Sequence, residues 1–214
     1  MDIDWFGHSC FRLRESGVIV ITDPYDKSIG YTMPRTRADI ITVSHDAPGH
    51  SAASAVKSDA RVLSKPGEYE VKGVFITGIQ TWRGGEAQGG AKQENTVFVF
   101  EFGELTACHL GNLSRVLTQA QVEAMPDIDV LMVPVGGGDA LDADKAAEVI
   151  SQLEPRIVVP MHYLTPYATT ALDPLSKFLK EMGVTEQAPQ DSLRVSRSDL
   201  PEETQVVVLD CKQG

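Results

Sequence analysis

The segment Val43-Ser44-His45-Asp46-Ala47-Pro48-Gly49-His50 comes directly after the apolar run Ile40-Ile41-Thr42 and carries two of the chain's five histidines. Neutral imidazole is the commonest protein ligand for zinc and related metals. Ligand sites of α/β proteins collect at the ends of strands. The segment therefore predicts a short buried strand in an α/β fold and a metal site at the end of that strand.

The other three histidines follow the same pattern. His8, His109 and His162 each come directly after an apolar run. Taken singly, each is equally consistent with a hydrogen-bonded loop residue. Because the ends of neighbouring strands meet at one edge of a sheet, we expect all five histidines to share a site.

Composition limits the classes of partner. The chain has 214 residues, of which 42% are hydrophobic, enough for one globular domain over residues 1–214. Its formal net charge is −11. Nucleic acids and anionic membranes carry the same sign of charge, so we expect neither as a partner. A small-molecule substrate is the simpler expectation.

The cysteines and the first residues indicate the compartment. Cys10, Cys108 and Cys211 are far apart and odd in number, so no disulfide framework is expected. Residues 1–11, MDIDWFGHSCF, are acidic and begin a strand directly, unlike a secretory signal. No apolar run approaches the ~20 residues that a membrane-spanning helix needs. We therefore expect a cytoplasmic protein, and exposed sheet edges leave room for a homo-oligomer.

The first half of the chain reads mostly as strands. Residues 10–24 contain two β-rich runs around Ser16-Gly17, which predicts a hairpin. Residues 83–95 contain four glycines and no large apolar side chain. We expect a mobile loop there, with strand resuming at Thr96.

The second half alternates strands and helices. Thr118 begins a capping box, Asp142 predicts the N-cap of a second helix, and Asp173-Pro174 opens a third. The apolar runs 130–135 and 156–161 predict buried strands. The fold class is therefore α/β (α+β), with two packed sheets flanked by helices.

Five short motifs occur in order along the chain: Gly7-His8-Ser9-Cys10, Thr22-Asp23-Pro24, the segment 43–50, His109-Leu110-Gly111-Asn112 and Pro160-Met161-His162-Tyr163. Together they resemble the motifs of the metallo-β-lactamase superfamily, in particular its short single-domain branch similar to the ascorbate-phosphate lactonases. The resemblance covers nearly the whole chain. It implies a four-layer αβ/βα sandwich with one or two metals at a sheet edge.

The resemblance also implies the roles of particular residues. Four histidines match metal ligands of the superfamily: His45, His50, His109 and His162. Asp23 matches a buried aspartate that orients the loops of the site from behind the ligands.

The metal motif is incomplete. The superfamily's second histidine falls on Ala47, and its two ligand aspartates fall on Gly49 and Asn112. A bridging carboxylate neutralises two metal ions held about 3.5–4 Å apart, which an asparagine cannot do. We therefore expect one divalent metal ion, zinc first and manganese or iron as alternatives, or no metal at all. Asp46 and Glu68 are candidate carboxylate donors.

A metal with an open coordination position would activate water for hydrolysis. The implied reaction is hydrolysis of a small soluble ester, lactone or phosphoester. His8 is the candidate acid or base beside the pocket, and Asp46 or Asn112 would position the attacking water. The simpler roles are a cap on residues 51–56 for Asp46 and a turn with Gly111 for Asn112.

The missing donors also favour an alternative. A degenerate, non-catalytic member of the superfamily would keep the fold and bind a ligand or partner without turnover. We rank the hydrolase first, by family analogy, because a fold alone confers no activity. A nuclease of the same fold is disfavoured by the net charge of −11.

Overall fold

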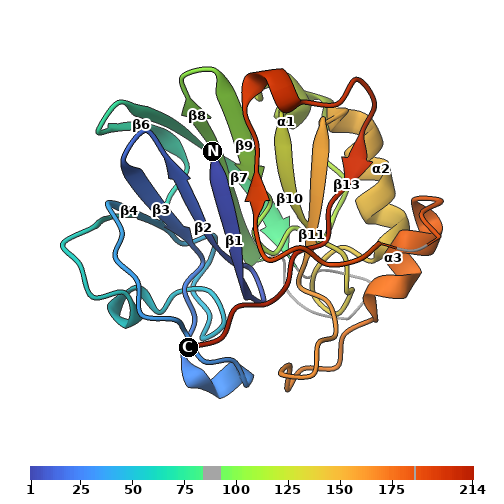
Figure 1. Ribbon diagram of the computed structural model, residues 1–214, viewed down its shortest axis with the longest axis horizontal. Coiled ribbons are helices and arrows are strands. Elements are labelled where there is room, and N and C mark those ends of the chain that lie inside the picture. The colour runs from blue at the N-terminus through green and yellow to red at the C-terminus, as the bar shows by residue number, and fades with distance from the viewer. Residues whose placement is uncertain (84–92, 186) are drawn as a thin grey trace.

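The computed structural model describes residues 1–83, 93–185 and 187–214, and two mixed sheets face each other across the core (Figure 1). The first sheet has the strand order β12 (Leu193–Arg194), β1 (Asp2–Gly7), β2 (Cys10–Glu15), β3 (Val18–Thr22), β4 (Ile40–Thr42), β5 (Arg61–Leu63). The second has the order β13 (Gln205–Val206), β11 (Ile157–Met161), β10 (Val130–Pro134), β9 (Leu105–His109), β8 (Gln93–Phe102), β7 (Val74–Arg83), β6 (Gly67–Val71).

The hairpin predicted around Ser16-Gly17 is confirmed. β2 and β3 pair antiparallel, with Glu15 opposite Val18. Ser16 and Gly17 have φ values of 49° and 82°. Two successive positive φ angles give the turn whose twist matches that of the flanking strands, so local sequence sets this register.

The three predicted helices are confirmed as well. α1 (Gln119–Glu123) begins with a capping box at Thr118, and α2 (Ala143–Leu153) has Asp142 as its N-cap. α3 (Leu175–Glu181) follows Pro174, which occupies the N-cap position. In Figure 1, α2 and α3 lie on the outer side of the second sheet, beside β11 and β13.

Helices are distributed unevenly between the sheets. Within the described part of residues 1–118, the helical elements are the 3₁₀ turns η1 (Lys27–Ile29) and η2 (Ala53–Ala55). A further 3₁₀ turn, η4 (Arg197–Asp199), lies near the carboxyl end of the chain. The expected α/β sandwich is thus confirmed. Beside the first sheet, where helices were also expected, the described residues form short 3₁₀ turns. None of the described helices is long and apolar enough to span a membrane.

The prediction of a loop over residues 83–95 is wrong at both ends. β7 continues to Arg83 and β8 begins at Gln93, and these two residues pair across the ladder. Polar residues were assigned to the loop, but cross-strand pairing extends the strands through them. Residues 84–92 of the predicted loop lie outside the described part of the chain.

Aromatic side chains on β8 fill the space between the sheets. The rings of Phe98 and Phe100 are stacked, with centroids 6.4 Å apart, and both side chains are fully buried. Their i, i+2 spacing places them on one face of the strand. This face anchors the second sheet against the first.

Phe100→Ala should lower the free energy of unfolding by about 3–5 kcal/mol, because it removes a buried ring and leaves a cavity. Urea denaturation monitored by circular dichroism measures the change. The matched control is Phe75→Ala on β7, where the side chain is 55% exposed and about 0.5 kcal/mol or less is expected. Equal losses in the two variants would contradict this account of the core.

Candidate metal centre

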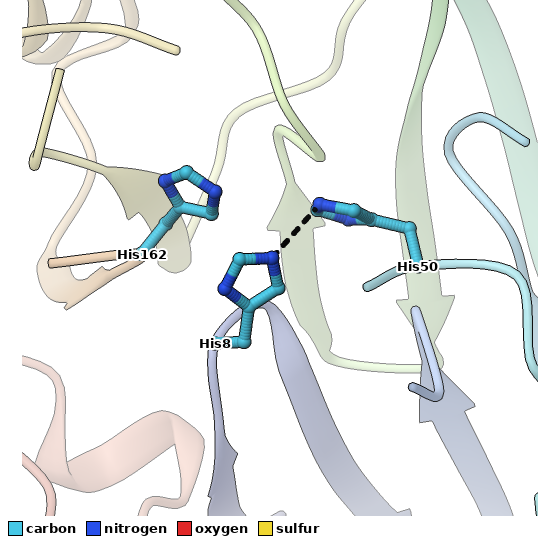
Figure 2. A group of neighbouring side chains, drawn as sticks. All are labelled: His8, His50 and His162. Carbon is cyan, nitrogen blue, oxygen red and sulfur yellow. Dashed lines mark hydrogen bonds between the residues drawn. The ribbon is translucent and has the colours of Figure 1, made fainter. Parts of the chain in front are cut away.

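Loops after strands of both sheets bring buried histidines together. His8 lies in the turn between β1 and β2, His45 and His50 lie in the loop after β4, and His162 directly follows β11. All four side chains are buried. Figure 2 shows His8, His50 and His162 turning ring nitrogens toward a common space.

Those three histidines form one group that could hold a metal ion. One ligand nitrogen from each ring lies within 4.8 Å of the others. The Nε2 atoms of His8 and His50 are 3.1 Å apart (Figure 2), and the ring centroids of His8 and His162 are 4.3 Å apart. The Nδ1 atom of His162 is buried and has no hydrogen-bond partner among the described residues.

Asp23, His45 and His50 form a second group within the same 4.8 Å limit. Asp23 is fully buried and accepts hydrogen bonds from His50 Nδ1 at 2.7 Å, from Ser44 Oγ at 2.6 Å and from the Ser44 amide at 2.7 Å. His45 Nδ1 lies 3.0 Å from Ser44 Oγ. Because the Ser44 hydroxyl donates to Asp23, we assign the proton of this second contact to His45 Nδ1.

The electrostatic setting keeps these rings neutral. Burial, strengthened by the neighbouring histidines, lowers the pKa values of His8 and His50 well below the usual range. Burial also lowers the pKa of His45 to about 3, with His50 acting in the same direction. The pKa of His162 is lowered by burial, against the effect of Asp139. Neutral imidazoles are the form that binds metal.

His109 lies outside both groups. Its Nε2 atom donates to the carbonyl of Ser9 at 2.8 Å, and its Nδ1 atom accepts from the Gly111 amide at 3.3 Å. Both ring nitrogens therefore have partners within the protein. The side chain is fully buried on β9, and these two hydrogen bonds use both of its ring nitrogens.

The predicted catalytic helpers are placed differently from one another. Asp46 is exposed, and its Oδ1 atom accepts a hydrogen bond from Ser51 Oγ at 3.0 Å, whereas the 3₁₀ turn that follows has Ala52 at its N-cap position and no side-chain cap. Asn112 is buried, and its Oδ1 atom has no partner among the described residues. Glu68 is exposed on β6 and belongs to neither metal group.

Asp139 is a carboxylate beside the histidines to which the sequence assigned no role. Asp139 follows the glycines that end β10, and its Oδ2 atom accepts from Arg83 Nη1 at 2.7 Å. Burial alone would raise the pKa of Asp139, but a hydrogen bond from Asn112 and the nearby His162 and Arg83 lower it. The glycine-rich turn before Asp139 is visible in the sequence, but nothing there places its carboxylate beside histidines that are distant in the chain.

A cavity of about 680 Å³ opens beside the histidines. His45 forms part of its wall, together with the charged side chains of Lys65, Arg83 and Glu94. Hydroxyl groups, including that of Thr96, and the apolar side chains of Val43 and Val62 also line it. The cavity therefore gives a polar small molecule access to the edge of the histidine cluster.

Asn95 on β8 supports the turn that carries Asn112. Its Oδ1 atom accepts from the Asn112 amide at 2.8 Å, and its Nδ2 atom donates to the Leu110 carbonyl at 3.0 Å and to Thr81 Oγ1 at 2.7 Å. The side chain is fully buried. Sequence reasoning assigned Asn95 to a loop and gave it no role.

Asn95→Ala should lower the free energy of unfolding by about 2–3 kcal/mol, because buried backbone groups lose their partners. Thermal and urea denaturation of the metal-free protein measure the loss. The neighbouring variant Glu94→Ala removes only an exposed side chain, 3.6 Å from the Lys65 ammonium, and should change stability by about 0.5 kcal/mol or less. An Asn95→Ala protein with the wild-type free energy of unfolding would show that the turn holds without this side chain.

Comparison with known proteins identifies the family. The family model of the beta-lactamase superfamily domain matches residues 2–162. Over 186 residues the chain is 30% identical to a UPF0173 protein of Pyrococcus furiosus, covering 77% of this chain and 84% of that protein. A UPF0173 metal-dependent hydrolase of Nanoarchaeum equitans is 30% identical over 189 residues, covering 77% and 85%.

A solved structure agrees with these relatives. It is a Thermotoga maritima protein named as a candidate Zn-dependent hydrolase of the metallo-β-lactamase superfamily. It matches this chain with a TM-score of 0.80 and 40% identity over 97% of both chains. The two mixed sheets, the order of the motifs and these relatives together show that the chain belongs to the metallo-β-lactamase superfamily, in its short UPF0173 branch.

Proposed function

We propose that this protein is a metal-dependent hydrolase of a small soluble ester, lactone or phosphoester, with one divalent metal ion and zinc as the expected metal. The observation that carries the proposal is the convergence of buried, neutral imidazoles from both sheets on one space. The relatives named as metal-dependent hydrolases support the same reaction class.

The donor set fits such a metal. Zinc–nitrogen bonds of 2.0–2.1 Å at tetrahedral angles put two ligand nitrogens about 3.3 Å apart. The Nε2 atoms of His8 and His50 are 3.1 Å apart, close to that spacing. Among the described residues, the carboxylate in these metal groups is that of Asp23, and three accepted hydrogen bonds leave it about one acceptor position, too few to bridge two ions. One metal ion is therefore the better fit.

When bound, a divalent metal supplies Lewis-acid polarisation of a substrate oxygen and activation of water near neutral pH. The chain's own residues then orient the metal ligands and transfer the protons of the reaction. Asp23 fixes the ring of His50 through Nδ1, as carboxylates commonly do behind metal-binding histidines. Asp139, kept ionised and hydrogen-bonded by Asn112, is our candidate to accept a proton from water and return it to the leaving group.

The cavity beside His45 suits a small-molecule substrate. Its volume of about 680 Å³ falls within the range of pockets for small ligands. Lys65 and Arg83 in its wall, which pair with Glu94 and Asp139, offer hydrogen-bond donors to an oxygen-rich group on the substrate. The net charge of −11 continues to argue against nucleic acid.

Metal removal tests the proposal. Elemental mass spectrometry of the purified protein should find about one zinc, manganese or iron per chain. Esters, lactones and phosphodiesters are then screened, and turnover should disappear after chelation and return on adding that metal. His162→Ala, prepared in parallel, should contain no metal and hydrolyse nothing. A protein that takes up no metal even after reconstitution would instead be the non-catalytic member of the superfamily.

A further inference from the structure

The two candidate metal groups share His50 but cannot use it in the same way. In the group with Asp23, the contact is made through His50 Nδ1, which donates to the carboxylate at 2.7 Å. Asp23 also accepts two hydrogen bonds from Ser44, so about three of its four acceptor positions are in use. The atom of His50 left for a metal is Nε2, and that atom faces His8.

The position of His8 is fixed by contacts of its backbone. Its carbonyl accepts hydrogen bonds from Trp5 Nε1 and from the amide of His162, each at 3.1 Å. This second bond joins a turn of the first sheet to the end of β11 in the second. His8 and His162 both have positive φ angles, 51° and 54°. Such backbone strain in non-glycine residues is concentrated at functional sites.

Gly49 leaves the space that the ring of His8 occupies. A Cβ atom at position 49 would lie 2.8 Å from His8 Nε2 and 3.1 Å from His8 Cδ2. Gly49 is absent from the residues with positive φ, so its backbone does not need glycine. Space for the imidazole is therefore the reason why a side chain is excluded here.

We infer that His8 is the third protein ligand of the metal, with His50 and His162, and that Gly49 is the position that admits its ring. This rests on the proposed metal-dependent function and gives His8 a ligand role in place of the acid or base role that the sequence suggested. His45 does not belong to the group of His8, His50 and His162, and it lines the proposed substrate cavity.

A double-mutant cycle on zinc affinity tests the inference. His8→Asn is the variant of choice, because asparagine tolerates the left-handed backbone that alanine would strain. It should weaken zinc binding by at least about 100-fold, more than loss of an outer partner does. Gly49→Ala should weaken it by about 10- to 100-fold by displacing the ring, and should add nothing in the His8→Asn background.

His45→Ala is the matched control from the same segment as Gly49, and its zinc affinity should stay close to that of the wild type. X-ray absorption of the zinc-loaded proteins gives an independent count of imidazole ligands. We expect three in the wild type and in His45→Ala, and two in His8→Asn. Circular dichroism of the metal-free proteins verifies that each variant is folded.

The outcomes separate the inference from the function on which it rests. If the wild type binds zinc and His8→Asn binds it equally well, the inference is wrong and the metal-dependent function stands. If His45→Ala loses zinc as His8→Asn should, the other group holds the metal and the inference is again wrong. If Gly49→Ala binds zinc as tightly as the wild type, the part of the inference in which Gly49 admits the ring of His8 is wrong. A wild type that binds no metal overturns both proposals.

Discussion

His50→Ala is expected to leave the purified protein with almost no bound metal. His50 is the residue that both candidate groups share, so its loss dismantles either ligand set. Its ring is also held by a buried carboxylate, which aims Nε2 at His8 before any metal arrives. Zinc affinity should fall by more than about 100-fold, and hydrolysis should fall with it. Elemental mass spectrometry and zinc titration measure the loss.

The control for this prediction is another buried histidine. His109→Gln keeps an amide that can donate to the Ser9 carbonyl, the bond that His109 Nε2 makes. Since the structure places His109 outside both groups, this variant should retain the wild-type metal content. Loss of metal in His109→Gln as well as in His50→Ala would favour the ligand set that the superfamily resemblance implies over the one that we infer.

Asp23→Ala is expected to lower both the stability of the protein and its affinity for metal. The substitution leaves three buried donors without an acceptor: the Ser44 amide, the Ser44 hydroxyl and His50 Nδ1. Each such orphaned group destabilises by about 1–3 kcal/mol, so we expect a total loss of about 4 kcal/mol. Metal affinity should also fall by about 10- to 100-fold, because the ring of His50 is no longer oriented. Urea denaturation of the metal-free protein and zinc titration measure the two effects separately.

Two further variants sharpen the result for Asp23. Asp23→Asn keeps one acceptor oxygen, so it should lose less stability than Asp23→Ala while still weakening zinc binding. Asp46→Ala removes an exposed carboxylate with one hydrogen bond to Ser51, and it should change stability by about 0.5 kcal/mol or less. An Asp23→Ala protein as stable as the wild type would show that Asp23 does not hold these groups.

Much of the fold could be predicted from the sequence because its signals are local. The hairpin at Ser16-Gly17, the capping box at Thr118 and the cap at Asp142 each depend on residues a few positions apart. The ends of β7 and β8 escaped prediction because pairing between Arg83 and Gln93 extends the strands through residues of loop-like composition. Cross-strand pairing is not visible in the composition of either strand alone.

The sequence by itself determined the superfamily, the two-sheet sandwich and the placing of histidines at strand ends. Only the tertiary structure decided which of them meet. His8 and His50 are 42 residues apart in the chain and 3.1 Å apart in space, whereas His109 turns to the Ser9 carbonyl instead. A ring's direction depends on the backbone and the packing around it, and these come from segments distant in the sequence. The position of the histidines at strand ends therefore predicts a shared site. Which histidines bind the metal depends on how the two sheets pack.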